Sequence, residues 1–311
     1  MSAPDPECIA KGSNPAEAPS FSQRWRDKSR HRHVPDDAAV WDSRVKELPD
    51  NYAPSSYSHD FLALATIASR DSVFDMGAGA GSLAIPCARA GHQVLACDFS
   101  PSMLKQLERN RRSNGVPAEF VRTMLLSWED DWEEAGIAPK SFDVAFASRS
   151  LITHDLEDSL RKLTNVARKK VCVTVVDGVS PRCFPGLLRD LGLTPDGHDD
   201  ASFVCAIARE LGLDPVASPI ESRRTDVFSS AEEAFAKYEP MLALTREKPC
   251  GAQLEEARKK LHAWLDTHLI PHAPTGATST GQAEAQTLWT PDVDRTISWA
   301  FVSWIAPDHL V

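Results

Sequence analysis

The sequence lacks any long apolar run. No stretch of its 311 residues approaches the ~18 consecutive apolar residues of a membrane-spanning helix, and none has the pattern of a secretory signal peptide. Paired cysteines are missing as well: the seven cysteines include no Cys-x-x-Cys pair, and Cys87, Cys97 and Cys172 lie inside apolar runs, where buried thiols are ordinary. These absences predict a soluble, cytoplasmic protein in a reducing compartment, without a membrane partner.

The sequence also contains fewer basic than acidic residues. The 44 Asp and Glu residues outnumber the 34 Lys and Arg residues, and the formal net charge is −10. Because a phosphate backbone is bound by a basic surface, we expect no nucleic-acid partner. The stretch 24–33, RWRDKSRHRH, is an exception with two interpretations, an RNA-binding arm or a solvated helix face. The solvated helix face fits better, because the rest of the chain is acidic and provides no basic groove beside such an arm.

Metal-ligand spacing is absent too. His198 is followed by two aspartates, and a second group of histidines comprises His262, His268 and His272. Neither group has the spacing of His-Glu-x-x-His or of a zinc ribbon, and a helix cap or a solvated face accounts for them. We therefore expect no metal.

The strongest feature that is present is a glycine-rich bend between two apolar segments. Gly77, Gly79 and Gly81 follow an apolar segment that includes Val73, and they precede the segment LAIPCA at 83–88. This pattern predicts a buried strand, a tight turn and a packed helix. Glycine allows positive φ angles and a close approach of ligand to main chain, while amides at the following helix start face that ligand. The bend is therefore predicted to be a ligand cradle.

Two acids beside the bend narrow the choice of ligand. Asp98 ends the apolar segment QVLAC at 93–97, where a carboxylate is placed to accept both hydroxyl protons of a ribose. Asp75 precedes the first glycine, where its charge suits a cationic or amino-bearing ligand and repels a pyrophosphate. The dinucleotide fingerprint Gly-x-Gly-x-x-Gly is not met, because Ser82 stands where its third glycine belongs.

Residues 75–82, DMGAGAGS, together with Asp98 resemble motif I and the acidic loop of class I S-adenosylmethionine (SAM) dependent methyltransferases. The resemblance covers residues 70–180 and implies SAM as the cofactor. The cofactor-binding residues that it implies here are Asp75, Gly77, Ala78, Gly79, Gly81, Asp98 and Phe99.

The same family usually carries a short acidic motif beside the adenine, in the loop after the third strand. In this sequence that loop is 126–132, LSWEDDW, and Ser127, Trp128 and Glu129 are the candidates for contacting the adenine. The sequence departs from the common Gly-Asp pattern, since two apolar residues precede the loop. A solvated loop with one buried tryptophan is the alternative interpretation.

Strand and helix patterns alternate along the chain. Strands are expected at 72–74, 93–97, 118–122, 141–148 and 171–176, with a helix that ends in the basic residues 168–170 before the last of these. Such alternation predicts an α/β fold with a parallel sheet and helices on both faces. The resemblance extends this to a doubly wound, mostly parallel seven-stranded sheet of Rossmann-like topology, with further strands expected within 216–228 and at 295–304.

The predicted organisation has five parts. These are a mobile tail (1–20), an N-terminal helical cap (21–69), the SAM-binding core (70–228), a helical insertion or lid (229–286) and the final strand (287–311). In the family such a cap commonly folds over cofactor and substrate, which makes Trp41, Tyr52 or Tyr57 candidates for closing the site. Plain packing is the alternative role for each aromatic residue.

The end of the fourth strand carries the candidates for the methyl-transfer site. Ligands of open α/β sheets bind outside the carboxyl ends of strands, so Ser148 is expected to border the cofactor. Arg149 is a candidate clamp for a substrate carboxylate, with a surface role as the alternative. His154 is the candidate base for an acceptor that must lose a proton, with a structural hydrogen bond as the alternative.

Methyl transfer from a sulfonium needs alignment and exclusion of water more than a dedicated base. One of the family's motifs for modifying nucleic-acid bases is missing, since no Asn or Asp is followed by Pro-Pro-aromatic. The sequence therefore predicts a SAM-dependent methyltransferase acting on a small-molecule substrate. A SAM-binding protein without catalysis and a nicotinamide-dependent oxidoreductase are the alternatives, the latter disfavoured by the glycine spacing and Asp75.

Overall fold

The computed structural model describes residues 19–30, 39, 41–42, 45, 55–272 and 287–309. Most of the tail expected at 1–20 and Tyr52 lie outside these residues. Within the described part of the chain, no helix is both long enough and apolar enough to span a membrane.

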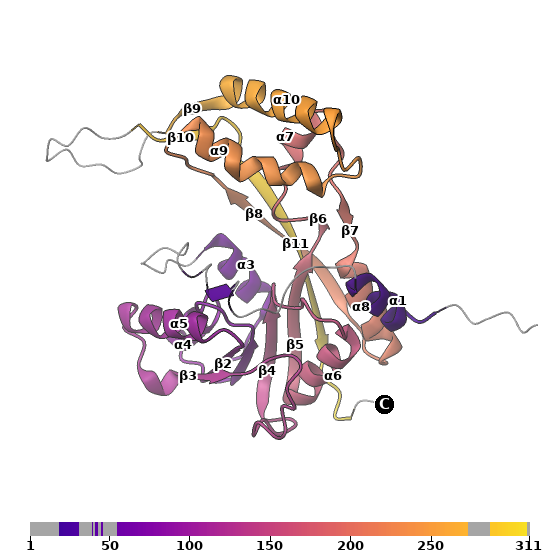
Figure 1. Ribbon diagram of the computed structural model, residues 1–311. Coiled ribbons are helices and arrows are strands. Elements are labelled where there is room, and N and C mark those ends of the chain that lie inside the picture. Colours follow the sequence, from indigo (N-terminus) through magenta and orange to yellow (C-terminus); the bar gives the residue numbers. More distant parts are fainter. Residues whose placement is uncertain are drawn as a thin grey trace, which may run out of the picture.

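A seven-stranded sheet forms the centre of the lower body in Figure 1. Its strands are β1 (Val73–Met76), β2 (Val94–Asp98), β3 (Val121–Leu125), β4 (Phe142–Ser148), β5 (Ala167–Val176), β8 (Val216–Arg224) and β11 (Arg295–Ile305). They lie side by side in the order β3-β2-β1-β4-β5-β11-β8. Strands β1 to β5 are parallel, and only β11 runs against its neighbours β5 and β8. The doubly wound, mostly parallel α/β fold predicted from the sequence is confirmed.

Helices cover both faces of this sheet, because its central strands are apolar on both sides. All residues of β1 and β2 are buried, which requires a layer of helices above and below. One core includes α1 (Phe21–Ser29), α6 (Leu156–Val166) and α8 (Asp200–Glu210). The opposite core includes α3 (Ser56–Ala65), α4 (Ala84–Arg89) and α5 (Pro101–Ser113).

A second, smaller body lies above the sheet at the far end of β8 and β11 (Figure 1). It consists of α7 (Pro185–Asp190), α9 (Ala231–Tyr238), η3 (Glu239–Leu244), α10 (Ala252–His268) and the pair β9 (Leu269–Pro271) and β10 (Trp289–Pro291). These elements share a separate apolar core that contains Phe184, Tyr238 and Trp264. The helical insertion expected before the last strand is present, and α7 joins it from an earlier part of the chain. The short strands β6 (Gly178–Val179) and β7 (Gly197–His198) pair where the chain leaves for α7 and returns.

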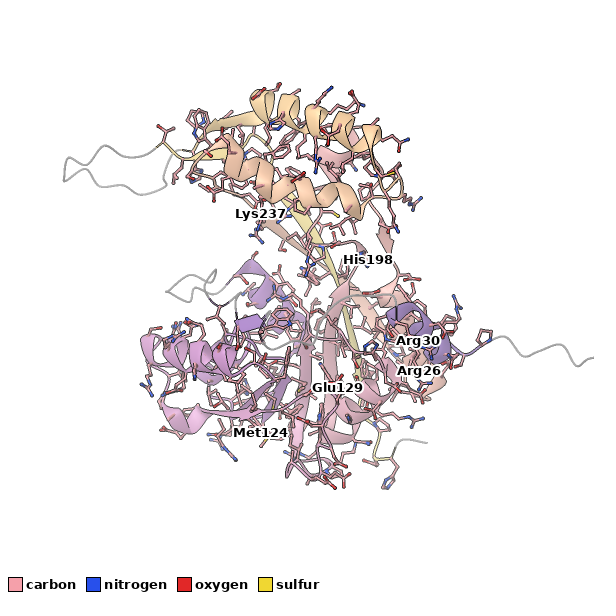
Figure 2. The ribbon with its side chains drawn as sticks, in the orientation of Figure 1. Arg26, Arg30, Met124, Glu129, His198 and Lys237 are labelled. Atoms are coloured by element: carbon pink, nitrogen blue, oxygen red, sulfur yellow. The ribbon has the colours of Figure 1, made fainter. Side chains whose placement is uncertain are left out.

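Helix α1 packs on the core through Trp25, which is buried and donates its ring N–H to the carbonyl of Thr153 at 3.0 Å. Arg26, labelled in Figure 2, pairs with Asp155 at 3.0 Å. Lys28 pairs with two aspartates at the start of α8, Asp199 and Asp200. The described part of the basic stretch is therefore a helix with exposed basic side chains, as the solvated-face interpretation expected, and Arg26 and Lys28 also pair with acidic residues of the core.

Two local expectations were wrong. Residues 118–120 form a single 3-10 turn, η2 (Ala118–Phe120), and the strand begins only at Val121. The basic residues 168–170 belong to β5 and not to the end of a helix, because α6 ends at Val166. Arg168 and Lys169 instead form ion pairs with Asp143 on the neighbouring strand β4, at 3.1 and 3.3 Å.

Candidate functional site

The glycine bend directly follows β1, and its main chain is hydrogen-bonded to the end of β2. The amides of Gly77 and Ala78 both donate to the carbonyl of Cys97, at 2.8 and 2.9 Å. Gly77, Gly79 and Gly81 have φ angles of +74°, +54° and +91°, values that side chains rarely allow. The bend thus takes the left-handed turn that the sequence pattern predicts.

Each of these glycines meets a different neighbour. A Cβ atom on Gly77 would lie 2.2 Å from the Cβ of Ser150, in the segment after β4. A Cβ atom on Gly81 would lie 3.0 Å from side-chain atoms of Ile85 and Leu107, within the helix layer. A Cβ atom on Gly79 would meet nothing within 4 Å. Packing therefore excludes a side chain at Gly77 and makes one tight at Gly81, whereas Gly79 leaves open space beside the main chain.

Asp98 stands at the end of β2 and holds the bend from the other side. Its two carboxylate oxygens accept the amide protons of Gly79 at 2.8 Å and of Ser100 at 2.9 Å. Burial raises the pKa of Asp98, these two amides oppose the rise, and Asp42 adds to it. Each oxygen has a second lone pair, so the carboxylate can still accept two hydroxyl protons from a ligand.

Asp75 lies beneath the bend and is 2% exposed. Burial and the nearby Asp98 raise its pKa to about 7, while the amide of Ala84 lowers it. Its Oδ2 atom has no hydrogen-bond partner among the described residues. An acid in this position gains from a positive charge nearby, because a cation offsets the cost of burying a carboxylate.

A pocket with about 560 Å³ of empty space, counted to its open mouth, lies against the bend. Six of the residues expected at the site line it: Gly77, Gly79, Asp98, Phe99, Trp128 and Arg149. The other lining residues are Trp41, Met76, Met103, Ser150 and Ile152. Trp41 was expected only as a candidate for closing the site.

Trp128 forms one wall and is fixed by a hydrogen bond. Its ring N–H donates to the carbonyl of Ser150 at 2.9 Å, and its ring lies 5.5 Å from that of Trp132. The bond ties the loop after β3 to the segment after β4. The aromatic wall is therefore held in place from both sides of the pocket.

Trp41 comes from the N-terminal cap, and its neighbour Asp42 is anchored to the start of α5. Ser100 donates its hydroxyl proton to Asp42 at 2.6 Å, and this bond lowers the pKa of Asp42. The Ser100 hydroxyl also accepts the amide proton of Met103 at 3.1 Å, as an N-cap residue does. One short network thus places Trp41 and Met103 at the same pocket.

The remaining expected residues lie outside the pocket lining. Ala78 and Gly81 support the bend, and Ser148 is hydrogen-bonded to the hydroxyl of Tyr57 at 2.7 Å. Ser127 bonds Glu129 within the loop after β3. The Nδ1 atom of His154 lies 3.3 Å from the hydroxyl of Ser29 on α1, which is the structural contact weighed as its alternative role.

A larger hollow, with about 1180 Å³ of empty space counted in the same way, lies elsewhere, between the loop after β3 and α6. Acids dominate its lining, which includes Glu129, Asp130, Asp131, Glu133, Glu134 and Asp158. It contains neither the glycine bend nor Asp98, so we do not assign the cofactor to it. Across the described ranges of the chain, no group of three or more His, Cys, Asp or Glu residues is placed to hold a metal ion.

Sequence reasoning did not single out Met103 as a site residue. Met103 follows the N-cap Ser100 by three positions, so it belongs to the first turn of the helix that begins beside Asp98. That position was a usable signal, because helix starts at strand ends border the ligand in open α/β sheets. Ser150 and Ile152 belong to the segment after β4, at the strand end where ligands of open α/β sheets bind.

Comparison with known proteins bears on this site directly. Residues 73–170 match a family model described as a methyltransferase domain. The chain is 28% identical over 259 residues to an uncharacterized protein of Haemophilus influenzae, covering 82% of this chain and 89% of that protein. It is 38% identical over 68 residues to the ribosomal protein L11 methyltransferase of Thermus thermophilus, covering 21% of this chain and 27% of that protein.

Among solved structures, the YcgJ protein of Bacillus subtilis aligns with a TM-score of 0.47 and 13% identity, over 81% of this chain and 99% of that chain. The matched family segment, residues 73–170, runs from β1 to the first residues of β5 and so contains the bend, Asp98 and the loop after β4. The match of residues 73–170 to the methyltransferase domain model agrees with the resemblance to methyltransferases over this segment.

Proposed function

We propose that the pocket at the glycine bend binds SAM and that the protein transfers its methyl group to a small-molecule acceptor. The observation that carries this proposal is the joint position of Gly79 and Asp98 on one pocket wall. The open space beside Gly79 allows a ligand to reach the main chain, and the Asp98 carboxylate retains acceptor capacity for a ribose. Phe99, Met103 and Trp128 would supply the apolar and aromatic surface around an adenine.

The charges of the site also fit SAM. Asp75 and Asp98 are buried near one another, and burial raises the pKa of both carboxyl groups. A sulfonium and an ammonium group would favour their ionised forms, whereas a pyrophosphate would be repelled by them. This is the physical reason to prefer SAM over a nicotinamide dinucleotide at this bend.

When bound, SAM would supply an activated methyl group and a neutral thioether leaving group, so the demands on the protein are modest. The pocket residues need to hold the reacting atoms in line and keep water out. Trp41, Trp128 and Ile152 provide apolar walls for this purpose. His154 lies against α1, so we do not assign a general base to the site.

The small-molecule acceptor is supported by charge and by architecture. The chain carries a net charge of −10, which is unfavourable for a nucleic-acid substrate. The second body, with its own core, extends from β8 and β11 above the sheet and would limit access for large partners (Figure 1). The match to ribosomal protein L11 methyltransferase covers only 27% of that protein, so we do not carry its acceptor over to this chain.

Calorimetry and turnover test the proposal in sequence. SAM and S-adenosylhomocysteine should each bind with one site per chain, and NADH should not. Incubation with SAM and a small-molecule extract should then release S-adenosylhomocysteine. Binding of NADH in place of SAM would overturn the cofactor assignment, and SAM binding without product from any extract would indicate a SAM-binding protein without catalysis.

A further inference from the structure

We propose that Arg149 binds an anionic group, a carboxylate or a phosphate, on the methyl acceptor. This inference rests on the proposed function and adds the chemical class of the substrate. Arg149 directly follows β4 and lines the same pocket as Gly79 and Asp98. It is exposed, so its guanidinium group is accessible to a ligand.

The backbone of Arg149 is held in an unusual conformation. Its φ angle of +59° lies in the left-handed region, which costs a residue with a side chain of the order of 1 kcal/mol. The amide of Arg149 donates to the carbonyl and to the hydroxyl of Thr174 on β5, both at 3.1 Å. These bonds compensate the strain and turn the side chain toward β5 and β11. Such strain is common at ligand sites, and here it coincides with a pocket wall.

Two aromatic rings fix the position of the guanidinium group. Its central carbon lies 4.2 Å from the ring centroid of Tyr57 and 5.7 Å from that of Trp299. Tyr57 is itself locked, because its hydroxyl lies 2.7 Å from that of Ser148 and 2.6 Å from that of Thr174. Stacking covers a face of the planar group and leaves its N–H edge to bind an anion in a bidentate way.

No carboxylate neutralises this cation within the described ranges. No Asp or Glu described in the structure lies within 4.0 Å of Arg149, although Arg26, Arg168 and Arg258 each have such a partner. In a chain with a net charge of −10, an oriented arginine at a pocket, with no carboxylate partner among the residues that the structure describes, is a binding group for an anion.

The Arg149 guanidinium lies away from Asp98, the residue that we expect to bind the cofactor's ribose. Asp98 ends β2, whereas the Arg149 guanidinium lies beside Trp299 of β11, and β1, β4 and β5 stand between those two strands. The cation therefore lies on the side of the pocket away from the ribose acid and toward the second body.

Two sources could supply an anion here, the acceptor and the carboxylate of SAM itself. Calorimetry with SAM and with decarboxylated SAM distinguishes them. If the acceptor is the source, Arg149→Gln should change the dissociation constant of SAM by less than threefold. If Arg149→Gln weakens SAM by the same factor that decarboxylation does in the wild-type protein, the anion is the cofactor's own and the acceptor assignment is overturned.

Measurements of turnover can test the chemical class of the acceptor even when the acceptor itself is unidentified. A small-molecule extract is separated on an anion-exchange resin, and S-adenosylhomocysteine formation is measured for the unbound and retained fractions at saturating SAM. Product should form from the retained fraction. With that fraction, Arg149→Gln should lower the rate at limiting acceptor at least tenfold, and Arg149→Lys should recover part of it.

Arg122→Gln is the matched control, since Arg122 is an exposed arginine on the edge strand β3, outside the pocket lining. It should turn over at the wild-type rate. Product from the unbound fraction alone, or an Arg149→Gln rate equal to that of the control, would overturn the inference while leaving methyl transfer intact. A wild-type protein that forms no product from either fraction would instead overturn the proposed function.

Discussion

Gly77 and Ser150 approach each other so closely that a Cβ atom on residue 77 would lie 2.2 Å from the Cβ of Ser150. The Ser150 hydroxyl donates to the carbonyl of Met76 at 2.7 Å, which locks the segment after β4 onto the end of β1. Ser150 also accepts the N–H of Trp128 through its own carbonyl. Three chain segments around the pocket therefore depend on the absence of a side chain at position 77.

Gly77→Ala should lower the free energy of unfolding by about 1–3 kcal/mol more than Gly115→Ala, because overpacking adds to the strain of a positive φ angle. Gly115 is a suitable control, since its φ angle of +64° is similar and a Cβ there meets nothing within 4 Å. Urea unfolding of both variants gives the comparison. Adding Ser150→Gly to Gly77→Ala should recover part of the loss, and equal losses for the two single variants would show that the contact is not limiting.

Gly79→Val should weaken SAM binding by at least about 1.4 kcal/mol, which is tenfold in Kd, because the new side chain would project into the pocket. Gly115→Val carries the same backbone strain outside the pocket and should bind SAM as the wild type does. Calorimetry on folded samples of both variants measures the difference. Unchanged affinity in Gly79→Val would contradict the close approach of the ligand to the main chain.

Asp98→Ala should weaken SAM binding by roughly 1–3 kcal/mol, the cost of removing the acceptor of hydroxyl and amide protons in a buried site. The control is Asp131→Ala, because Asp131 also accepts two backbone amide protons, from Glu133 and Glu134, but lies outside this pocket. Both variants should lose some stability, and only the first should lose affinity. Equal SAM affinities in the two variants would argue against the ribose contact.

Asp75 should make the protein less stable as the pH rises toward neutrality. Burial raises its folded-state pKa to about 7 from the ordinary 3.8, so the folded state keeps a proton that the unfolded state has lost. The wild type should therefore lose about 1 kcal/mol per pH unit relative to Asp75→Asn between pH 4 and 7, and nothing further above that. Urea unfolding of both proteins from pH 4 to 8 tests this, and parallel curves would show that Asp75 is ionised throughout.

The sequence by itself determined the elements and their order. The apolar runs of β1, β2 and β4 are local patterns, and the positive φ angles at Gly77, Gly79 and Gly81 follow from the glycine spacing. Asp98 was identified because a strand end places its last side chain at a known edge of the sheet. These features depend on neighbours in sequence, and a single chain contains that information.

The tertiary structure alone decided which side chains meet. His154 contacts Ser29 on α1, and the basic residues 168–170 lie in β5. In both cases the partners are more than twenty residues away in the sequence. The stacking of Arg149 on Tyr57 joins the residue after β4 to α3, which no periodicity in either segment encodes. Local propensity and hydrophobic periodicity specify helices and strands, whereas contacts between distant segments depend on how those elements dock and in which register.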